Sequence, residues 1–327
     1  MECHAVGDVA TRAVERSGMA SDRSIPVLND SDIETAADMA SLINICDAAI
    51  VAAANDEMTA PARHAVDFGA GQLVFTTGGN KQAVGFRAYD TFPNSKQDQV
   101  VAVWHPNSGQ LTGVIVGELL GAIRTGALGG VGINRMAAAD ATNCAVIGTG
   151  VQARTQLLAC AAVRSLSRVR VFSRNEHNRQ AFAQEMSTRI GLEIEPVTSA
   201  PAATADAEIV LLATSSGVPV VSFNDLAADV HVSTVGPKLK EYCELGTDVV
   251  EAAQLVATDS PQQIEAQGER HFLHDTSAWG RIAHLGTVDA RPDGVRRTVF
   301  LSAGLAGTEV LIADAILRAH VANNITR

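Results

Sequence analysis

A glycine-rich turn between an apolar segment and a predicted helix is the part of this chain with the clearest chemistry. Residues 144–153 read Cys-Ala-Val-Ile-Gly-Thr-Gly-Val-Gln-Ala, so Gly148 and Gly150 follow a short apolar strand and Ala153 lies in the first helical turn. The first glycine permits the tight turn, the second lets a phosphate approach the backbone, and the small third residue lets helix and strand pack closely. Together with the unpaired N–H groups of the helix N-terminus, this pattern predicts a site for the pyrophosphate of a dinucleotide.

Alternating strands and helices follow the turn, as a βαβ unit requires. An alternating strand is expected at 168–172, followed by a polar helix at 176–190. Further strands are expected at 192–197, 208–213, 231–235 and 254–257. Strands and helices that alternate with short connections predict an α/β fold with a parallel, doubly wound sheet.

The end of the second strand predicts which dinucleotide is bound. A carboxylate there accepts hydrogen bonds from the ribose 2′-OH of NAD, whereas an arginine can hold the 2′-phosphate of NADP. This chain reads Ser173-Arg174-Asn175, with no carboxylate before Glu176. NADP(H) is therefore favoured, and NAD(H) is the alternative if Arg174 is a solvated surface residue.

The composition excludes several classes of protein. The 327 residues are enough for two domains, and no apolar run approaches the 18 or more residues that span a membrane. The net charge of −11 argues against binding to nucleic acid or to anionic membranes. The five cysteines lack C-x-x-C spacing, and His64, His271 and His274 lack a plausible third ligand, so neither a disulfide framework nor a metal site is expected. We expect a soluble, cytoplasmic protein with a flexible N-terminal extension at residues 1–23.

The part of the chain before the turn has a different organisation. An N-cap at 29–32 and an amphipathic pattern predict one helix through residues 33–48. Strands are expected at 73–77, 84–91, 100–104 and 111–116, with turns between them. This is typical of a mostly antiparallel sheet, on which a C-terminal helix at 308–321 can pack. A cleft between two such domains could hold both nicotinamide and substrate.

Three arginines of this first part could bind a carboxylate. Arg63, Arg87 and Arg124 each carry a planar guanidinium that holds a carboxylate through two hydrogen bonds. If two or three of them converge on one cleft, they suit a substrate that resembles an amino acid. Each could instead be an ordinary surface arginine.

Taken together, these motifs resemble the ornithine cyclodeaminase/mu-crystallin family over most of the chain. The resemblance rests on Gly148-x-Gly150-Val-Gln-Ala, on Arg124-Thr-Gly-Ala, and on segments 61–63, 213–220, 235–236, 244–245 and 299–306. It implies a Rossmann domain at 138–304, inserted in an α+β domain at 24–137 and 305–327 that binds substrate and dimerises. It also implies a nicotinamide cofactor and imine chemistry at the α-carbon of an amino acid.

The resemblance assigns roles to individual residues. Arg63 and Arg124 match the carboxylate-binding arginines of the family. The cofactor site predicted from the motif and the resemblance together comprises Thr125, Gly148, Gly150, Val151, Gln152, Ser173, Arg174, Asn175, Ala213, Thr214, Ser215, Val235, Gly236 and Ser302.

Two positions depart from the family pattern. Arg87 stands where the family usually has a lysine that contacts substrate, and arginine is a poor acid–base group. Lys238 stands where the cyclodeaminases have an aspartate that binds the substrate amine. We expect Lys238 either to donate the proton, with a pKa lowered by burial or by nearby arginines, or to bind a further anionic group. It could also face solvent.

The sequence thus predicts an oxidoreductase that transfers a hydride between NAD(P)H and the α-carbon of an imino or amino acid. A diamine such as ornithine would be repelled by Lys238, so an anionic or small substrate is expected, dicarboxylic imines among them. The alternatives are an amino-acid dehydrogenase, a cyclodeaminase for another amino acid, and a catalytically inactive NADP(H)-binding protein. The expected partners are the small-molecule substrate and a second copy of the chain in a homodimer.

Overall fold

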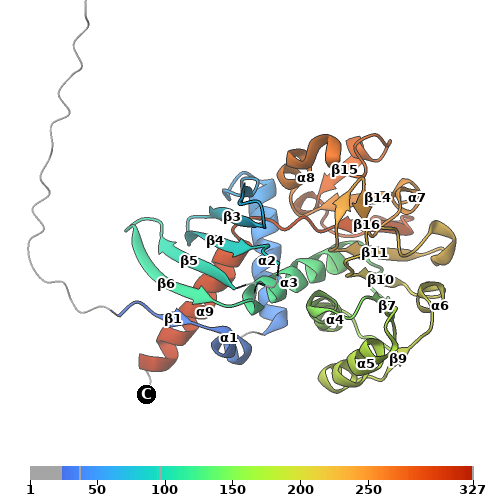
Figure 1. Ribbon diagram of the computed structural model, residues 1–327, viewed down its shortest axis with the longest axis horizontal. Helices are drawn as coiled ribbons and strands as arrows, with labels where there is room; N and C mark the ends of the chain where they lie inside the picture. The colour runs from blue at the N-terminus through green and yellow to red at the C-terminus, as the bar shows by residue number, and fades with distance from the viewer. Residues whose placement is uncertain (1–23, 37, 94, 96–97, 326–327) are drawn as a thin grey trace, which may run out of the picture.

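A computed structural model describes residues 24–325 apart from residues 37, 94, 96 and 97, so the predicted extension at 1–23 lies outside the described residues. The described residues form two large β-sheets that lie side by side, with helix α3 (Leu119–Met136) running between them (Figure 1).

The first sheet is built from the N-terminal part of the chain. Its strand order is β1-β6-β5-β4-β3-β2, and all pairs are antiparallel except β1 with β6. Its strands are β1 (Val27–Leu28), β2 (His64–Asp67), β3 (Gln72–Gly79), β4 (Val84–Asp90), β5 (Gln99–His105) and β6 (Gln110–Val116). Helix α9 (Thr308–Ile325), from the far end of the sequence, packs on one face of it. Gly85 and Gly113 allow this close packing, because side chains there would meet Val310 and Leu317 of the helix.

The second sheet has the parallel, doubly wound arrangement that the sequence predicts. Its strand order is β15-β14-β16-β11-β10-β7-β8-β9, and every pair is parallel. Its strands are β7 (Asn143–Ile147), β8 (Arg168–Phe172), β9 (Ile194–Pro196), β10 (Ile209–Leu212), β11 (Val230–Thr234), β14 (Leu255–Thr258), β15 (Ile282–His284) and β16 (Arg297–Leu301). The chain winds in opposite directions from β7 and from β10, so the order reverses between these two strands. Cofactors of such sheets bind at this point, beyond the carboxyl ends of the strands.

Helices pack against both sheets. Besides α3 and α9 they are α1 (Asp30–Ala36), α2 (Met39–Ala54), α4 (Val151–Val163), α5 (Glu176–Ile190), α6 (Ala200–Thr204), α7 (Thr247–Glu251) and α8 (Pro261–Gln267). A small hairpin of β12 (Lys238–Leu239) and β13 (Tyr242–Cys243) follows β11. Short 3₁₀ turns lie at η1 (Phe223–Asp225), η2 (Gly268–Arg270), η3 (Trp279–Arg281) and η4 (Leu285–Thr287).

The prediction of one helix through residues 33–48 was wrong. The structure has two helices, α1 and α2, because Asp38 caps a new helix: its carboxylate accepts hydrogen bonds from the amide and the hydroxyl of Ser41. The two helices meet at an angle of 94°, and only together do they have the length and composition of a membrane span. None of the described helices has them alone.

The division into domains at residues 137/138 and 304/305 stays a prediction. The strands of the first sheet come from residues 27–116 and those of the second from residues 143–301. Helix α3 connects the two groups of strands along the chain. Helix α9 follows the second group and packs on the first sheet.

Candidate active site

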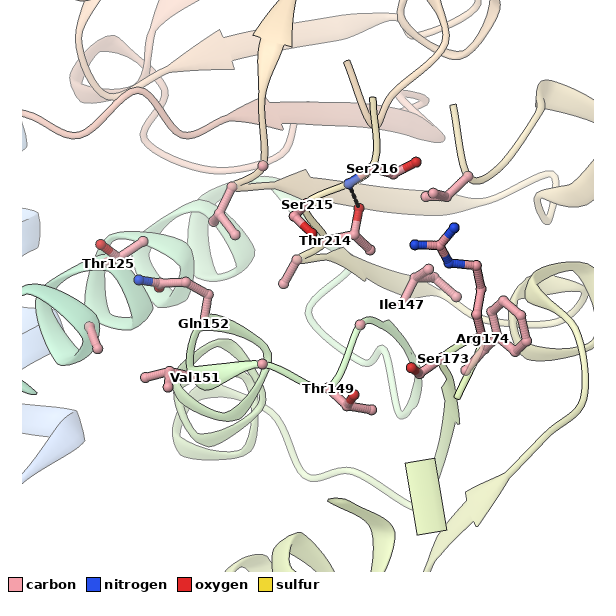
Figure 2. Close-up of a pocket in the computed structure, with 18 of the residues that line it drawn as sticks. Thr125, Ile147, Thr149, Val151, Gln152, Ser173, Arg174, Thr214, Ser215 and Ser216 are labelled. Carbon is pink, nitrogen blue, oxygen red and sulfur yellow. Dashed lines mark hydrogen bonds between the residues drawn. The ribbon is translucent and has the colours of Figure 1, made fainter. Parts of the chain in front are cut away.

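The carboxyl ends of four neighbouring strands line a cleft of about 910 Å³. Ile147 and Phe172 end β7 and β8, whereas Ala213 and Val235 follow directly after β10 and β11. The cleft therefore lies where the strand order reverses, as expected for a dinucleotide. Figure 2 shows how side chains from α3, α4 and the strand ends surround it.

The glycine turn has the geometry that a pyrophosphate requires. Gly148 has φ +118°, a conformation that favours glycine, and a side chain there would collide with the carbonyl oxygen of Ala213. Gly150 is the N-cap of α4 and has no side chain that could cap the helix. A Cβ added to it would meet nothing within 4 Å. The N-terminus of α4 thus opens onto free space beside the cleft. The residues present fit a dinucleotide.

Arg174 lies at the end of the cleft where the adenosine ribose of a dinucleotide is expected. It lines the cleft with Ser173, and its guanidinium points toward the cavity (Figure 2). Asn175 has a different position: it caps α5 by accepting a hydrogen bond from the amide of Asn178, at 3.0 Å. Glu176, the first carboxylate after β8, belongs to α5 and is exposed.

Glu244 fixes the backbone of the opposite wall although it is fully buried. Its carboxylate accepts hydrogen bonds from the amide and hydroxyl of Thr214, both at 2.7 Å, and from the hydroxyl of Thr234, at 2.6 Å. It also accepts one from the amide of Gly236, at 2.7 Å. Because Thr214 follows β10 and Gly236 follows β11, one carboxylate joins the ends of two strands that flank the cleft.

Two of the predicted arginines meet at a carboxylate that the sequence did not single out. Glu309, in the first turn of α9, is 2.9 Å from Nη1 of Arg87 and 2.5 Å from Nη2 of Arg124, and all three residues are buried. Burial would raise the pKa of Glu309, but Arg124 and Arg87 hold it below its ordinary value. The Glu309 carboxylate is therefore ionised at neutral pH.

Arg87 reaches the cleft from β4. Its Nε donates to Oε1 of Gln99 at 2.9 Å, and its guanidinium lies 4.2 Å from the ring centroid of Tyr89. A Cβ at Gly121 of α3 would lie 2.7 Å from its Nη2. Arg87, Gln99 and Gly121 all line the cleft, so one edge of this guanidinium faces it.

Arg63 and Arg124 converge on Gly304. A Cβ there would lie 3.3 Å from Nη2 of Arg63 and 2.8 Å from Nη1 of Arg124, and its φ of +84° also favours glycine. Arg63 is bonded to the carbonyl of Ala303, to Gln263 of α8 at 3.0 Å and to the hydroxyl of Tyr89 at 3.3 Å. The buried Nε of Arg124 has no hydrogen-bond partner among the described residues. Such an unpaired donor suits a ligand carboxylate.

Lys238 is buried behind the cleft wall and does not point into solvent. Its ammonium donates to the carbonyl of Gly236 at 2.8 Å. Burial lowers the pKa of Lys238, while Glu244 and Asp259 oppose this change. The structure thus places this amine beside, but not on, the lined surface.

Most predicted cofactor residues lie around the one cleft. Those that line it, together with Arg87, are Thr125, Gly148, Gly150, Val151, Gln152, Ser173, Arg174, Ala213, Thr214, Ser215, Val235 and Gly236. Arg63, Arg124, Asn175, Lys238 and Ser302 are not among its lining residues. The roles assigned to all of these residues stay predictions. Across the described residues, no three His, Cys, Asp or Glu side chains gather in a possible metal site.

Residues 24–323 match the sequence model of the ornithine cyclodeaminase/mu-crystallin family. The chain belongs to this family. The family and the α/β fold predicted from the sequence are thus confirmed.

Relatives within the ornithine cyclodeaminase/mu-crystallin family include two enzymes whose names describe them as reductases of an imine. The chain is 28% identical over 260 residues, 75% of its length and 79% of the relative's, to a delta(1)-pyrroline-2-carboxylate reductase of Bacillus cereus. It is 24% identical over 245 residues, 72% and 76% of the two lengths, to the iminosuccinate reductase of Paracoccus denitrificans.

A solved structure of this family has the same fold. It is the delta(1)-pyrroline-2-carboxylate reductase of Thermococcus litoralis in complex with NADH and L-proline. The TM-score is 0.83 and the identity 25%, and the match covers 91% of this chain and 98% of the other.

Proposed function

We propose that this protein catalyses the reduction of an α-imino acid to the amino acid with NAD(P)H. The observation that carries the proposal is the Arg87–Glu309–Arg124 cluster, because its Arg87 lines a cleft whose other parts fit a dinucleotide. The predicted class, an NAD(P)-dependent oxidoreductase acting on C=N or CH–NH bonds, agrees with the reductases to which the chain is similar.

We assign each residue a separate role in this reaction according to its position. A bound nicotinamide supplies the hydride that the imine carbon accepts. Arg124, whose Nη1 lies close to Gly304, holds the substrate carboxylate there, and Arg63 assists it through its Nη2. The imine nitrogen must gain a proton, so that imine, NAD(P)H and H⁺ give amine and NAD(P)⁺. Lys238, bonded to the carbonyl of Gly236 on the cleft wall, is the proposed source of that proton.

We further propose that NADP(H) is preferred to NAD(H). Arg174 and Ser173 line the cleft at the end of β8, and the first carboxylate after this strand, Glu176, lies in the first turn of α5. A guanidinium at this place can pair with a 2′-phosphate, whereas the ribose 2′-OH of NAD lacks the carboxylate that it usually meets.

The proposal also includes a homodimer formed through the first sheet. The face opposite α9 carries a row of apolar residues from four paired strands, Phe75, Ala88, Val100 and Val116. Phe75 is 37% exposed and Val100 36%. Neighbouring residues of the same face include Val66, Val84, Phe86 and Trp104. An apolar sheet face of this kind is typical of a contact with another protein chain. A cytoplasmic location stays a prediction from the sequence.

The function is tested by measuring NADPH and NADH oxidation with a panel of imines. The panel contains 1-pyrroline-2-carboxylate, pyruvate with ammonia or methylamine, and oxaloacetate with ammonia. We expect turnover with at least one of them and none with ornithine and NAD(P)⁺. Turnover of ornithine alone would contradict the proposal. Binding of NADPH in a fluorescence titration without turnover of any imine or amino acid would establish the inactive alternative.

A further inference from the structure

The charge of the substrate end of the cleft is set by a carboxylate that lies next to it. Glu309 is 1% exposed and pairs with both Arg87 and Arg124. Two buried guanidiniums that share one carboxylate carry one positive charge in excess. Leaving such a charge without a partner is costly, so the pair favours an anionic ligand.

The donors that remain on the two arginines are few. Nε of Arg87 is bonded to Gln99 and Nη1 to Glu309, which leaves Nη2, beside Gly121, as its remaining nitrogen. Nη2 of Arg124 is also bonded to Glu309, which leaves its unpaired Nε and its Nη1, the atom close to Gly304. These two nitrogens do not share an edge of the guanidinium, because the N–H of Nε lies on the side of Nη2, so Nη1 is the donor that remains beside Gly304. Nη1 of Arg124 therefore suits a single carboxylate beside Gly304.

The other charged residues near this end do not provide a binding site for a second carboxylate. Glu118, which is exposed and lines the same cleft as Arg87, contributes a negative charge. Lys238 lies outside the lining residues, and its electrostatic neighbours include Glu244 and Asp259. Arg63 already donates to Gln263, Tyr89 and Ala303.

We infer that Glu309 sets the charge specificity of this site, so that it accepts an imino acid with one carboxylate and rejects one with two. The inference rests on the proposed function and narrows its substrate class. A second carboxylate near Arg87 would compete with Glu309 for the same guanidinium and would meet the negative charges of Glu309 and Glu118. Specificity would thus come from repulsion of the wrong substrate as well as attraction of the right one.

The test compares two imines in the wild type and in Glu309→Gln. The imines are 1-pyrroline-2-carboxylate, with one carboxylate, and iminosuccinate formed from oxaloacetate and ammonia, with two. We expect the wild type to favour the monocarboxylate in kcat/KM. In Glu309→Gln the ratio of the two kcat/KM values should shift toward the dicarboxylate by at least about tenfold, because one repulsive charge is lost. Glu309→Asp keeps the charge and should keep the wild-type preference.

A binding measurement separates this role from a general loss of structure. Calorimetry measures the binding of two ligands to the protein with NADP⁺, so that no reduction can occur. The ligands are pyrrole-2-carboxylate, with one carboxylate, and fumarate, with two. Fumarate should bind more tightly to Glu309→Gln than to the wild type. Asp47→Asn is the matched control, since Asp47 also pairs with a buried arginine, Arg135, but lies away from the cleft. It should leave both ratios unchanged.

The outcomes distinguish the inference from the function beneath it. If the wild type reduces no imine, the proposed function fails. If it reduces imines but already prefers iminosuccinate, or if Glu309→Gln leaves the ratio as it was, the inference on Glu309 is overturned while the function stands. Should Glu309→Gln not fold, the exposed Glu118→Gln removes the other negative charge. It should shift the ratio in the same direction by a smaller factor, and no shift would also overturn the inference.

Discussion

At the scale of single residues, the charges that we propose to select the cofactor lie apart from those that we propose to select the substrate. Arg174 lies at the end of β8, whereas Arg87 and Arg124 lie on β4 and α3 and are neutralised in part by Glu309. Arg174 is exposed and forms no ion pair within 4.0 Å among the described residues. Its charge is therefore available to a ligand, and changing it should leave the substrate end intact.

We expect Arg174→Ser to raise the KM for NADPH by about 10- to 100-fold, because a hydrogen bond to a charged group contributes about 1.5–3 kcal/mol. The KM for NADH should change little. Steady-state kinetics with both cofactors measures the effect. Arg168→Ser removes a cation from the opposite end of β8, where Arg168 pairs with Asp206 and Glu195, and serves as the control. Equal losses with NADPH and NADH in Arg174→Ser would contradict the assignment.

At the scale of elements, α3 is the helix that connects the proposed cofactor end of the site with the proposed substrate end. It carries Arg124 toward Glu309 and Thr125 toward the cleft, and it packs closely on α4, which begins at the glycine turn. Gly126 makes this approach possible, since a Cβ there would lie 2.7 Å from the carbonyl oxygen of Thr155. A backbone atom cannot move aside as a flexible side chain can.

Gly126→Ala should therefore destabilise the protein by about 1–3 kcal/mol, since overpacking outweighs the gain in helix propensity. Urea unfolding measures the loss, and the KM values for cofactor and substrate should both rise as α3 moves away from α4. Gly280→Ala is the control, because a Cβ at Gly280 meets nothing within 4 Å. It should leave stability unchanged or raise it slightly. If both variants unfold alike, close packing at Gly126 is not the cause.

The elements also show which parts of the site the sequence can predict. The glycine turn and the strand before it are local features, because the backbone conformation at Gly148 and the open N-terminus of α4 follow from nearby residues. The link between Arg87 and Glu309 joins positions 222 residues apart. Nothing near Glu309 distinguishes it from the acidic residues that are common in the first turn of a helix. Such a pair becomes visible only when the fold brings α9 onto the first sheet.

At the scale of the whole molecule, the exposed face of the first sheet is the surface with the strongest reason to bind another copy. We expect the double variant Phe75→Asp and Val100→Asp to be a monomer where the wild type is a dimer, because charges on that face would be buried without partners. Sedimentation analysis measures the change. Val321→Asp, at an exposed apolar residue of α9, should remain dimeric. A wild type that sediments as a monomer would contradict the dimer.

The position of α9 has a consequence for how the protein is made. The strands of the first sheet are complete at Val116, but the helix that covers their inner face begins at Thr308. During synthesis at about 5–20 residues per second, roughly 10 to 40 s pass between these points. Both apolar faces of the nascent sheet are uncovered throughout that interval. The emerging chain is then most open to aggregation and to capture by chaperones.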